Sequence, residues 1–100
     1  GIFPDGLHTL VEHGNSEKNA WPLLDLYKLK LDGSGEMQRL THFTNYKGYK
    51  ANQGVISDDG KYMCFQIGKD NTEPGVGFGF LIMDLEEAAK HLEGFKTYDQ

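Results

Sequence analysis

The sequence predicts an all-β protein built from two imperfect copies of one antiparallel unit, followed by one short α-helix. Residues 3–14 (FPDGLHTLVEHG) align without gaps on residues 57–68 (SDDGKYMCFQIG), so position 3 corresponds to position 57 and the offset is 54. The same offset places residues 26–31 (LYKLKL) on residues 80–85 (FLIMDL). Repeats of this kind indicate units that cannot bury their apolar faces alone.

Strands and turns of the first unit are indicated by Asp-Gly pairs, which favour tight hairpin turns beside β-forming runs. The pairs at 5–6 and 32–33 flank runs of alternating apolar residues. They predict strands at about 7–13, 24–31 and 37–43, with a long loop at 14–23 between the first two.

The second unit repeats this plan. A loop at 44–51 leads to a short strand near 52–57, and the Asp59-Gly60 turn leads to a strand at 61–67. In that strand Met63, Phe65 and Ile67 lie on one face, and Tyr62, Cys64 and Gln66 lie on the other. A loop at 68–77 precedes the last strand, at 78–85.

The C-terminal segment predicts one helix over about 85–93. Asp84 is suited to the N-cap, with Glu87 three residues later as in a capping box. Leu85, Ala88, Ala89 and Leu92 form one apolar stripe, and Glu86 and Lys90 have the spacing of a helical ion pair.

Composition limits the function classes. The chain has 100 residues, a net charge of −5 and a single arginine, Arg39, so clustered basic residues of the kind that nucleic acid or anionic membranes require are not expected. No apolar run approaches the roughly 20 residues of a membrane span, and no signal-peptide pattern opens the chain. Cys64 is the only cysteine, which excludes an internal disulfide, and its position in an apolar strand predicts a buried core residue.

Two segments resemble the repeats of TolB-like β-propellers. Residues 24–35 (LDLYKLKLDGSG) with 38–41 (QRLT) resemble the "D-hydrophobic-Y … DGS … RLT" half of that repeat. Residues 57–65 (SDDGKYMCF) resemble its "SPDGK-hydrophobic-x-F" half, although Asp58 replaces the usual proline and Ile56 the usual aromatic residue.

The resemblance implies about one and three-quarter antiparallel propeller blades with roughly six strands. It divides the chain into repeats at about 1–51 and 52–84, and a helix and tail at 85–100. The first unit lacks its initial strand and the second its last. We therefore expect the C-terminal piece of a larger propeller, which opens in mid-repeat; alternatives are several copies closing a ring, or a compact sheet fold of its own.

No residue pattern points to catalysis, a metal or a cofactor. His8 and His13 lie on opposite faces of one predicted strand and cannot chelate together. Ser34 lacks the strand-to-helix elbow of a hydrolase nucleophile, and Ser57, Asp58 and Asp59 fit turn chemistry.

Candidate binding residues lie on the predicted long loops, which emerge at one end of the units. Aromatic side chains with polar groups suit stacking on a sugar or contact with a partner protein. These candidates are Trp21, Tyr46, Lys47, Tyr49 and Lys50. The structural alternative for Trp21 is that its side chain fills the gap between neighbouring blades.

These observations favour a non-catalytic interaction or ligand-binding module that uses its long-loop face. The alternative is an accessory propeller piece of a prolyl-oligopeptidase-type peptidase or a sugar lyase, with the catalytic residues elsewhere. A third possibility is an autonomous two-repeat protein that oligomerises. By resemblance, a periplasmic or secreted location is expected.

Overall fold

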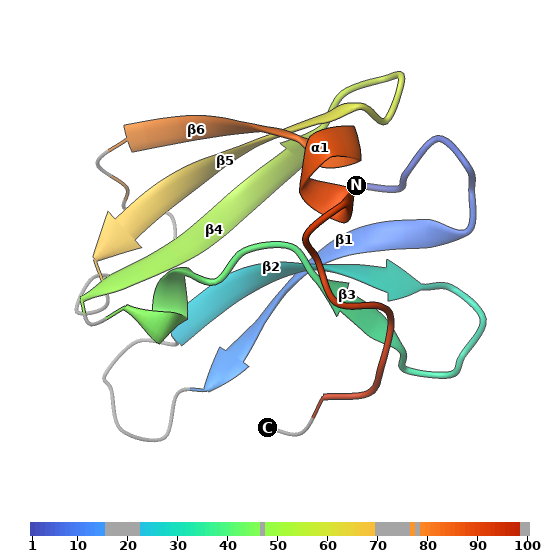
Figure 1. The fold of residues 1–100 in the computed structure, drawn as a ribbon, viewed down its shortest axis with the longest axis horizontal. Coiled ribbons are helices and arrows are strands. Elements are labelled where there is room, and N and C mark those ends of the chain that lie inside the picture. The colour runs from blue at the N-terminus through green and yellow to red at the C-terminus, as the bar shows by residue number, and fades with distance from the viewer. Residues whose placement is uncertain (16–22, 47, 70–76, 78, 99–100) are drawn as a thin grey trace.

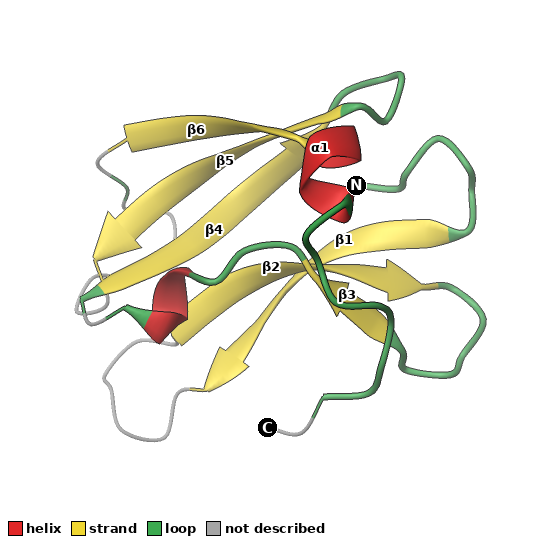
Figure 2. Cartoon of the chain, in the orientation of Figure 1, coloured by secondary structure: helices red, strands yellow, loops and turns green. Residues whose placement is uncertain are grey.

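The computed structural model describes residues 1–15, 23–46, 48–69, 77 and 79–98. Its elements follow the order β1 (His8–Asn15), β2 (Leu23–Lys30), β3 (Met37–Arg39), the 3-10 helix η1 (Phe43–Asn45), β4 (Tyr49–Ile56), β5 (Tyr62–Lys69), β6 (Gly79–Asp84) and α1 (Leu85–Ala89). The strands form two three-stranded antiparallel sheets, ordered β1-β2-β3 and β4-β5-β6, which do not close into a barrel (Figures 1 and 2).

The two sheets repeat the same strand register at the offset of 54. In the first sheet His8 pairs with Lys30, and in the second Tyr62 pairs with Asp84, each 54 positions later. The correspondence holds along the β1–β2 and β5–β6 pairs as far as His13 with Asp25 and Ile67 with Gly79. The sequence repeat is therefore a structural repeat, and we call the two sheets unit 1 and unit 2.

The turns that open the units also match, bond for bond. Gly6 N donates to Phe3 O at 3.0 Å, and Gly60 N donates to Ser57 O at 2.9 Å. Both glycines have positive φ, 68° and 74°, which a residue with a Cβ rarely adopts. In each turn an aspartate accepts from the backbone two residues later: Leu7 N to Asp5 Oδ1 at 2.8 Å and Lys61 N to Asp59 Oδ1 at 3.0 Å.

The first three residues occupy the place that the end of β4 has in unit 2. Ile2 pairs with Thr9 as an isolated bridge, and the equivalent pair, 54 positions later, is Ile56 with Met63. Unit 1 thus carries a short stretch of a strand beside β1, where unit 2 has the whole of β4.

The sheets pack through β4, which lies against β1 and β2. A β-bulge between Asn52 and Val55, with Gln53 at φ 52°, brings Gly54 against the first sheet. A Cβ on Gly54 would lie 2.5 Å from Leu10 Cδ2 and 3.1 Å from Leu26 Cδ1. The core between the sheets contains Phe3, Leu26, Leu40, Ala51, Met63 and Phe65.

The two faces of the sheet of unit 2 lie in different environments. Its inner face, with Met63, Phe65, Leu81 and Met83, is turned toward unit 1. Its outer face is turned away, and most of its side chains are exposed. We use the name outer face for Val55, Tyr62, Cys64, Phe80 and Ile82.

The tail after α1 returns to unit 1. Lys96 pairs with Met37 through two backbone hydrogen bonds of 2.8 and 2.9 Å, on the edge of β3 that β2 does not use. The Tyr98 ring meets the Tyr27 ring edge-on at 5.0 Å between centroids. The tail therefore protects the edge of β3, the sheet edge of unit 1 that would otherwise be open.

The structure confirms the all-β class and the positions of six strands and one helix, with five corrections. β4 begins at Tyr49 rather than near 52, so Tyr49 and Lys50 belong to a strand and not to the loop predicted at 44–51. The third strand ends at Arg39 rather than near 43, because the following residues turn into η1. The helix ends at Ala89 rather than 93. Lys90 pairs with Glu87 at 2.9 Å rather than with Glu86. Cys64 is exposed rather than buried, because nothing described in the structure covers the outer face.

Substitution of Gly54 tests the close packing of the sheets. We expect Gly54→Ala to lower the free energy of unfolding by about 1–3 kcal/mol, since the added methyl would overlap the Leu10 side chain. Gly79→Ala is the matched control, because a Cβ there meets nothing within 4 Å. Urea unfolding monitored by circular dichroism measures both, and equal effects of the two substitutions would contradict this packing.

Candidate functional site

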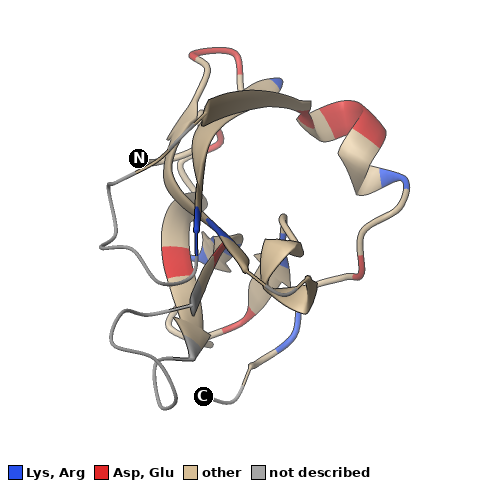
Figure 3. Cartoon of the chain, turned by 90° about the vertical axis from the view of Figure 1, so that its left-hand side faces the viewer, with Lys and Arg blue, Asp and Glu red and all other residues tan. Residues whose placement is uncertain are grey.

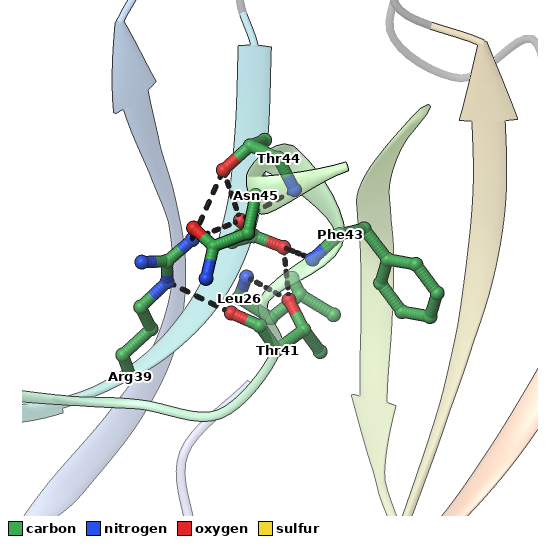
Figure 4. A network of polar contacts seen from close by, with 7 residues as sticks. Leu26, Arg39, Thr41, Phe43, Thr44 and Asn45 are labelled. Atoms are coloured by element: carbon green, nitrogen blue, oxygen red, sulfur yellow. Dashed lines mark hydrogen bonds and ion pairs between the residues drawn. The ribbon is translucent and has the colours of Figure 1, made fainter. Parts of the chain in front are cut away.

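A buried carboxylate organises the wall of the candidate site. Asp25 in β2 is 1% exposed, and its two oxygens accept five hydrogen bonds (Figure 4). The donors are Thr41 Oγ1 at 2.6 Å, Phe43 N at 2.9 Å, Thr44 N at 3.2 Å, Thr44 Oγ1 at 2.6 Å and Arg39 Nη2 at 2.9 Å. A buried charge is tolerated only when it is paired and hydrogen-bonded in this way.

The partners of Asp25 are themselves fixed. Thr41 Oγ1 accepts from Leu26 N at 3.0 Å, so one hydroxyl joins β2 to the segment after β3. Arg39 Nε donates to Thr41 O at 2.9 Å, and Arg39 Nη2 also reaches Asn45 Oδ1 at 3.2 Å. The network therefore holds η1 against the end of β2 (Figure 4).

An apolar groove of about 520 Å³ lies between this segment, β6 and α1. The network positions one wall: the Phe43 ring lies 5.9 Å from the Phe65 ring, and Tyr46 is 68% exposed at the rim. The opposite wall comes from β6 and the helix. The lining residues are Leu40, Thr41, His42, Phe43, Tyr46, Phe65, Leu81, Ile82, Met83, Ala88, His91 and Leu92.

The groove has little charge of its own. Partial burial lowers the pKa of His42, and the positive charge of Arg39 lowers it further. At neutral pH the His42 ring is therefore uncharged, which suits an apolar groove. Figure 3 shows acidic residues on the helix that follows β6, where Glu86 and Glu87 occupy the first turn. The carboxylates that act on His42 are Asp25 and Glu93, which oppose the lowering of its pKa.

The structure separates the five predicted binding residues. Tyr46 lies at the groove and Tyr49 begins β4 and is exposed. Lys50 is completely buried, so its ammonium group does not lie on the surface of this chain. Trp21 and Lys47 lie outside the described residues.

Asp25 and the groove-lining residues of β6 were not predicted from the sequence as parts of a site. The signal for Asp25 was present, because the DLY and RLT motifs supply Asp25, Arg39 and Thr41, three members of the network. The sequence pattern marks Leu81 and Met83 only as core positions of a strand, because it does not show whether a further strand pairs with that strand.

The turn motifs have structural roles. Ser57 Oγ donates to Asp59 Oδ1 at 2.7 Å and accepts from Tyr62 N at 3.0 Å. The hydrogen bond from Lys61 N lowers the pKa of Asp59, and the Ser57 hydroxyl lowers it further. Within the described residues, no three or more His, Cys, Asp or Glu side chains are grouped so that they could hold a metal ion. Neither helical segment described in the structure has the length and apolarity needed to cross a membrane.

Comparison of the chain with protein-family profiles, curated proteins and solved structures finds no match.

Removal of the Asp25 carboxylate tests the network. We expect Asp25→Ala to lower the free energy of unfolding by about 3–5 kcal/mol, because it leaves the buried hydroxyl and amide donors without their acceptor. Asp58→Ala is the control, because this exposed turn residue has no such network, and its effect should stay within about 0.5 kcal/mol. Thermal and urea unfolding measure both; a loss below about 1 kcal/mol for Asp25→Ala would contradict the network.

The pKa of His42 provides a pH test. Because the folded-state pKa lies below the usual value of about 6.5, the unfolded chain binds the proton more readily. The associated stability is complete above about pH 6.5 and declines as the pH falls below it. An NMR titration should show His42 titrating at a lower pH than it does in urea, and His42→Gln should reduce the loss of stability between neutral and mildly acidic pH. A His42 pKa at or above the unfolded value would contradict this.

Proposed function

We propose that this chain is a non-catalytic interaction module formed by two consecutive blade-type units of a TolB-like β-propeller. The observation that carries the proposal is the identical register and turn bonding of the two units at the offset of 54. Units related in this way stack so that each covers the face of its neighbour. The motif residues that suggested the family have structural roles in the turns and in the Asp25 network, which favours a scaffold over a catalyst.

The packing between the units supports addition of further units. Leu26 is 0% exposed because unit 2 covers it, whereas its equivalent 54 positions later, Phe80, is 69% exposed. Leu10 likewise packs on the core, and its equivalent, Cys64, is exposed. The outer face of unit 2 is thus the same surface that unit 1 buries.

The composition of the outer face favours burial in an assembly. Val55 is 66% exposed and Ile82 is 74% exposed, and they share one sheet face with Phe80 and Tyr62. Contiguous exposed apolar side chains mark interaction surfaces. We propose that this face packs against a further unit, either from the rest of a propeller or from another copy of the chain.

A partner protein or a sugar would then bind at the long-loop end. Tyr46 and Tyr49 are exposed there, at the start of β4 and beside η1 (Figure 1). Both supply an aromatic face and a hydroxyl, which suits either ligand class. A periplasmic or secreted location would be consistent with the family to which the motifs point.

Native mass spectrometry with size-exclusion chromatography tests the assembly. We expect the chain to associate into species of several copies, and Val55→Lys to shift it to the monomer by placing a charge on the outer face. Thr97→Lys is the control, since it adds the same charge at an exposed position in the tail. A folded monomer at every concentration would contradict packing of one copy on another through the outer face.

A further inference from the structure

The free edge of β6 is the position at which the two units differ most. In unit 1, β2 pairs with β1 on one side and with β3 on the other. In unit 2, β6 pairs with β5, and no strand among the described residues pairs with its other edge. The β2–β3 register, in which Tyr27 pairs with Arg39 and Leu29 with Met37, therefore has no counterpart beside Leu81 and Met83.

The backbone of β6 is oriented to accept a strand. In unit 1, Lys30 N donates to Glu36 O at 3.0 Å, and Leu40 N donates to Leu26 O at 2.8 Å, so the even-numbered residues of β2 bond toward β3. In unit 2, Leu85 N donates to Lys61 O at 2.9 Å, just as Leu31 N donates to Leu7 O at 2.9 Å. The odd-numbered residues of β6 thus bond toward β5, and the backbone groups of Phe80, Ile82 and Asp84 point to the open edge.

No described segment of the chain supplies this strand. At the offset of 54, Asp25, Arg39 and Thr41 become Gly79, Glu93 and Phe95, so unit 2 lacks the anchor that holds the segment after β3. Residues 91–93, which correspond to β3, instead follow α1, and the tail pairs with Met37 of unit 1.

The side chains beside the edge fit an extended apolar segment. The groove of about 520 Å³ runs beside β6 and is lined there by Leu81, Met83 and Phe65. A strand paired with β6 would place alternate side chains opposite Leu81 and Met83, where they would fill this groove. Before Asp84 the edge has no charged residue or proline, the devices that usually prevent strand pairing.

From these observations we infer that β6 binds an extended segment of a partner protein as an added antiparallel strand. The segment takes the register of β3 and carries apolar side chains at the two alternate positions opposite Leu81 and Met83. This deepens the proposed interaction function by naming the partner class and a second surface. It rests on the repeat, and it does not require that the outer face stacks on another unit.

A peptide built from the strand that fills the equivalent position is the probe. This peptide has the sequence of residues 36–43 with the substitution Arg39→Val. Position 39 would lie opposite Leu81, and Arg39 is replaced because Gly79, the equivalent of Asp25, offers no carboxylate to pair with an arginine. Fluorescence anisotropy of the labelled peptide with the whole chain should show saturable binding. The same peptide with Gln38→Pro should bind about tenfold more weakly or not at all, since position 38 donates its N–H toward β6.

Two variants of the protein separate backbone pairing from side-chain contact. Ile82→Pro removes the edge N–H without removing a bond to β5, and should weaken peptide binding about tenfold. Ile82→Ala keeps that N–H, and binding should stay within about threefold of the wild type. Circular dichroism checks that each variant is folded. If Ile82→Pro does not fold, the binding of the two peptides to the wild-type chain is compared instead.

The outcomes are distinct from those of the stacking test. Val55→Lys should abolish self-association and retain saturable peptide binding, because Val55 lies on β4 and not at the β6 edge. Absence of saturable binding, equal binding of the Gln38→Pro peptide, or equal weakening by Ile82→Ala and Ile82→Pro would each overturn strand addition.

Discussion

The buried carboxylate of Asp25 is the interaction on which the arrangement of this chain depends. Removing a charge from water is costly unless donors surround it, and here the donors come from the segment immediately after β3. The chain must therefore leave the sheet after Arg39 and fold back as η1. That turn places Phe43 against Phe65 and Tyr46 at the rim of the groove. One polar requirement in β2 thus shortens β3 and creates one wall of the candidate site.

The same requirement explains why two similar sequences fold differently at their ends. Unit 2 follows unit 1 through the turn, the β5–β6 register and the bond from Leu85 N. It diverges after Leu85, and the residues that would match the anchor of unit 1 are Gly79, Glu93 and Phe95. Without that anchor, Asp84 caps α1 by accepting from Glu87 N at 3.1 Å, and the chain leaves the sheet as a helix. The open edge of β6 thus lies where unit 1 has β3 and its anchor.

The sequence predicts the local elements well and their surroundings poorly. The Asp-Gly turns and the constant offset locate all six strands, because turn chemistry and alternation act within a few residues. The exposure of Cys64 and the burial of Lys50 were not predictable, since each depends on what lies against that face of the sheet. The bulge at Gln53 was also missed, because its left-handed conformation uses a residue that does not favour it. The groove could not be predicted from either wall alone, because its walls come from segments about 40 residues apart in the sequence.

The open edge and the outer face are parts of one sheet, and Ile82 belongs to both. Its side chain lies on the outer face, and its backbone groups point to the edge. An added strand would extend the outer face by one strand. Strand addition and stacking should therefore favour each other, because the strand that completes unit 2 also completes the face on which the next unit packs.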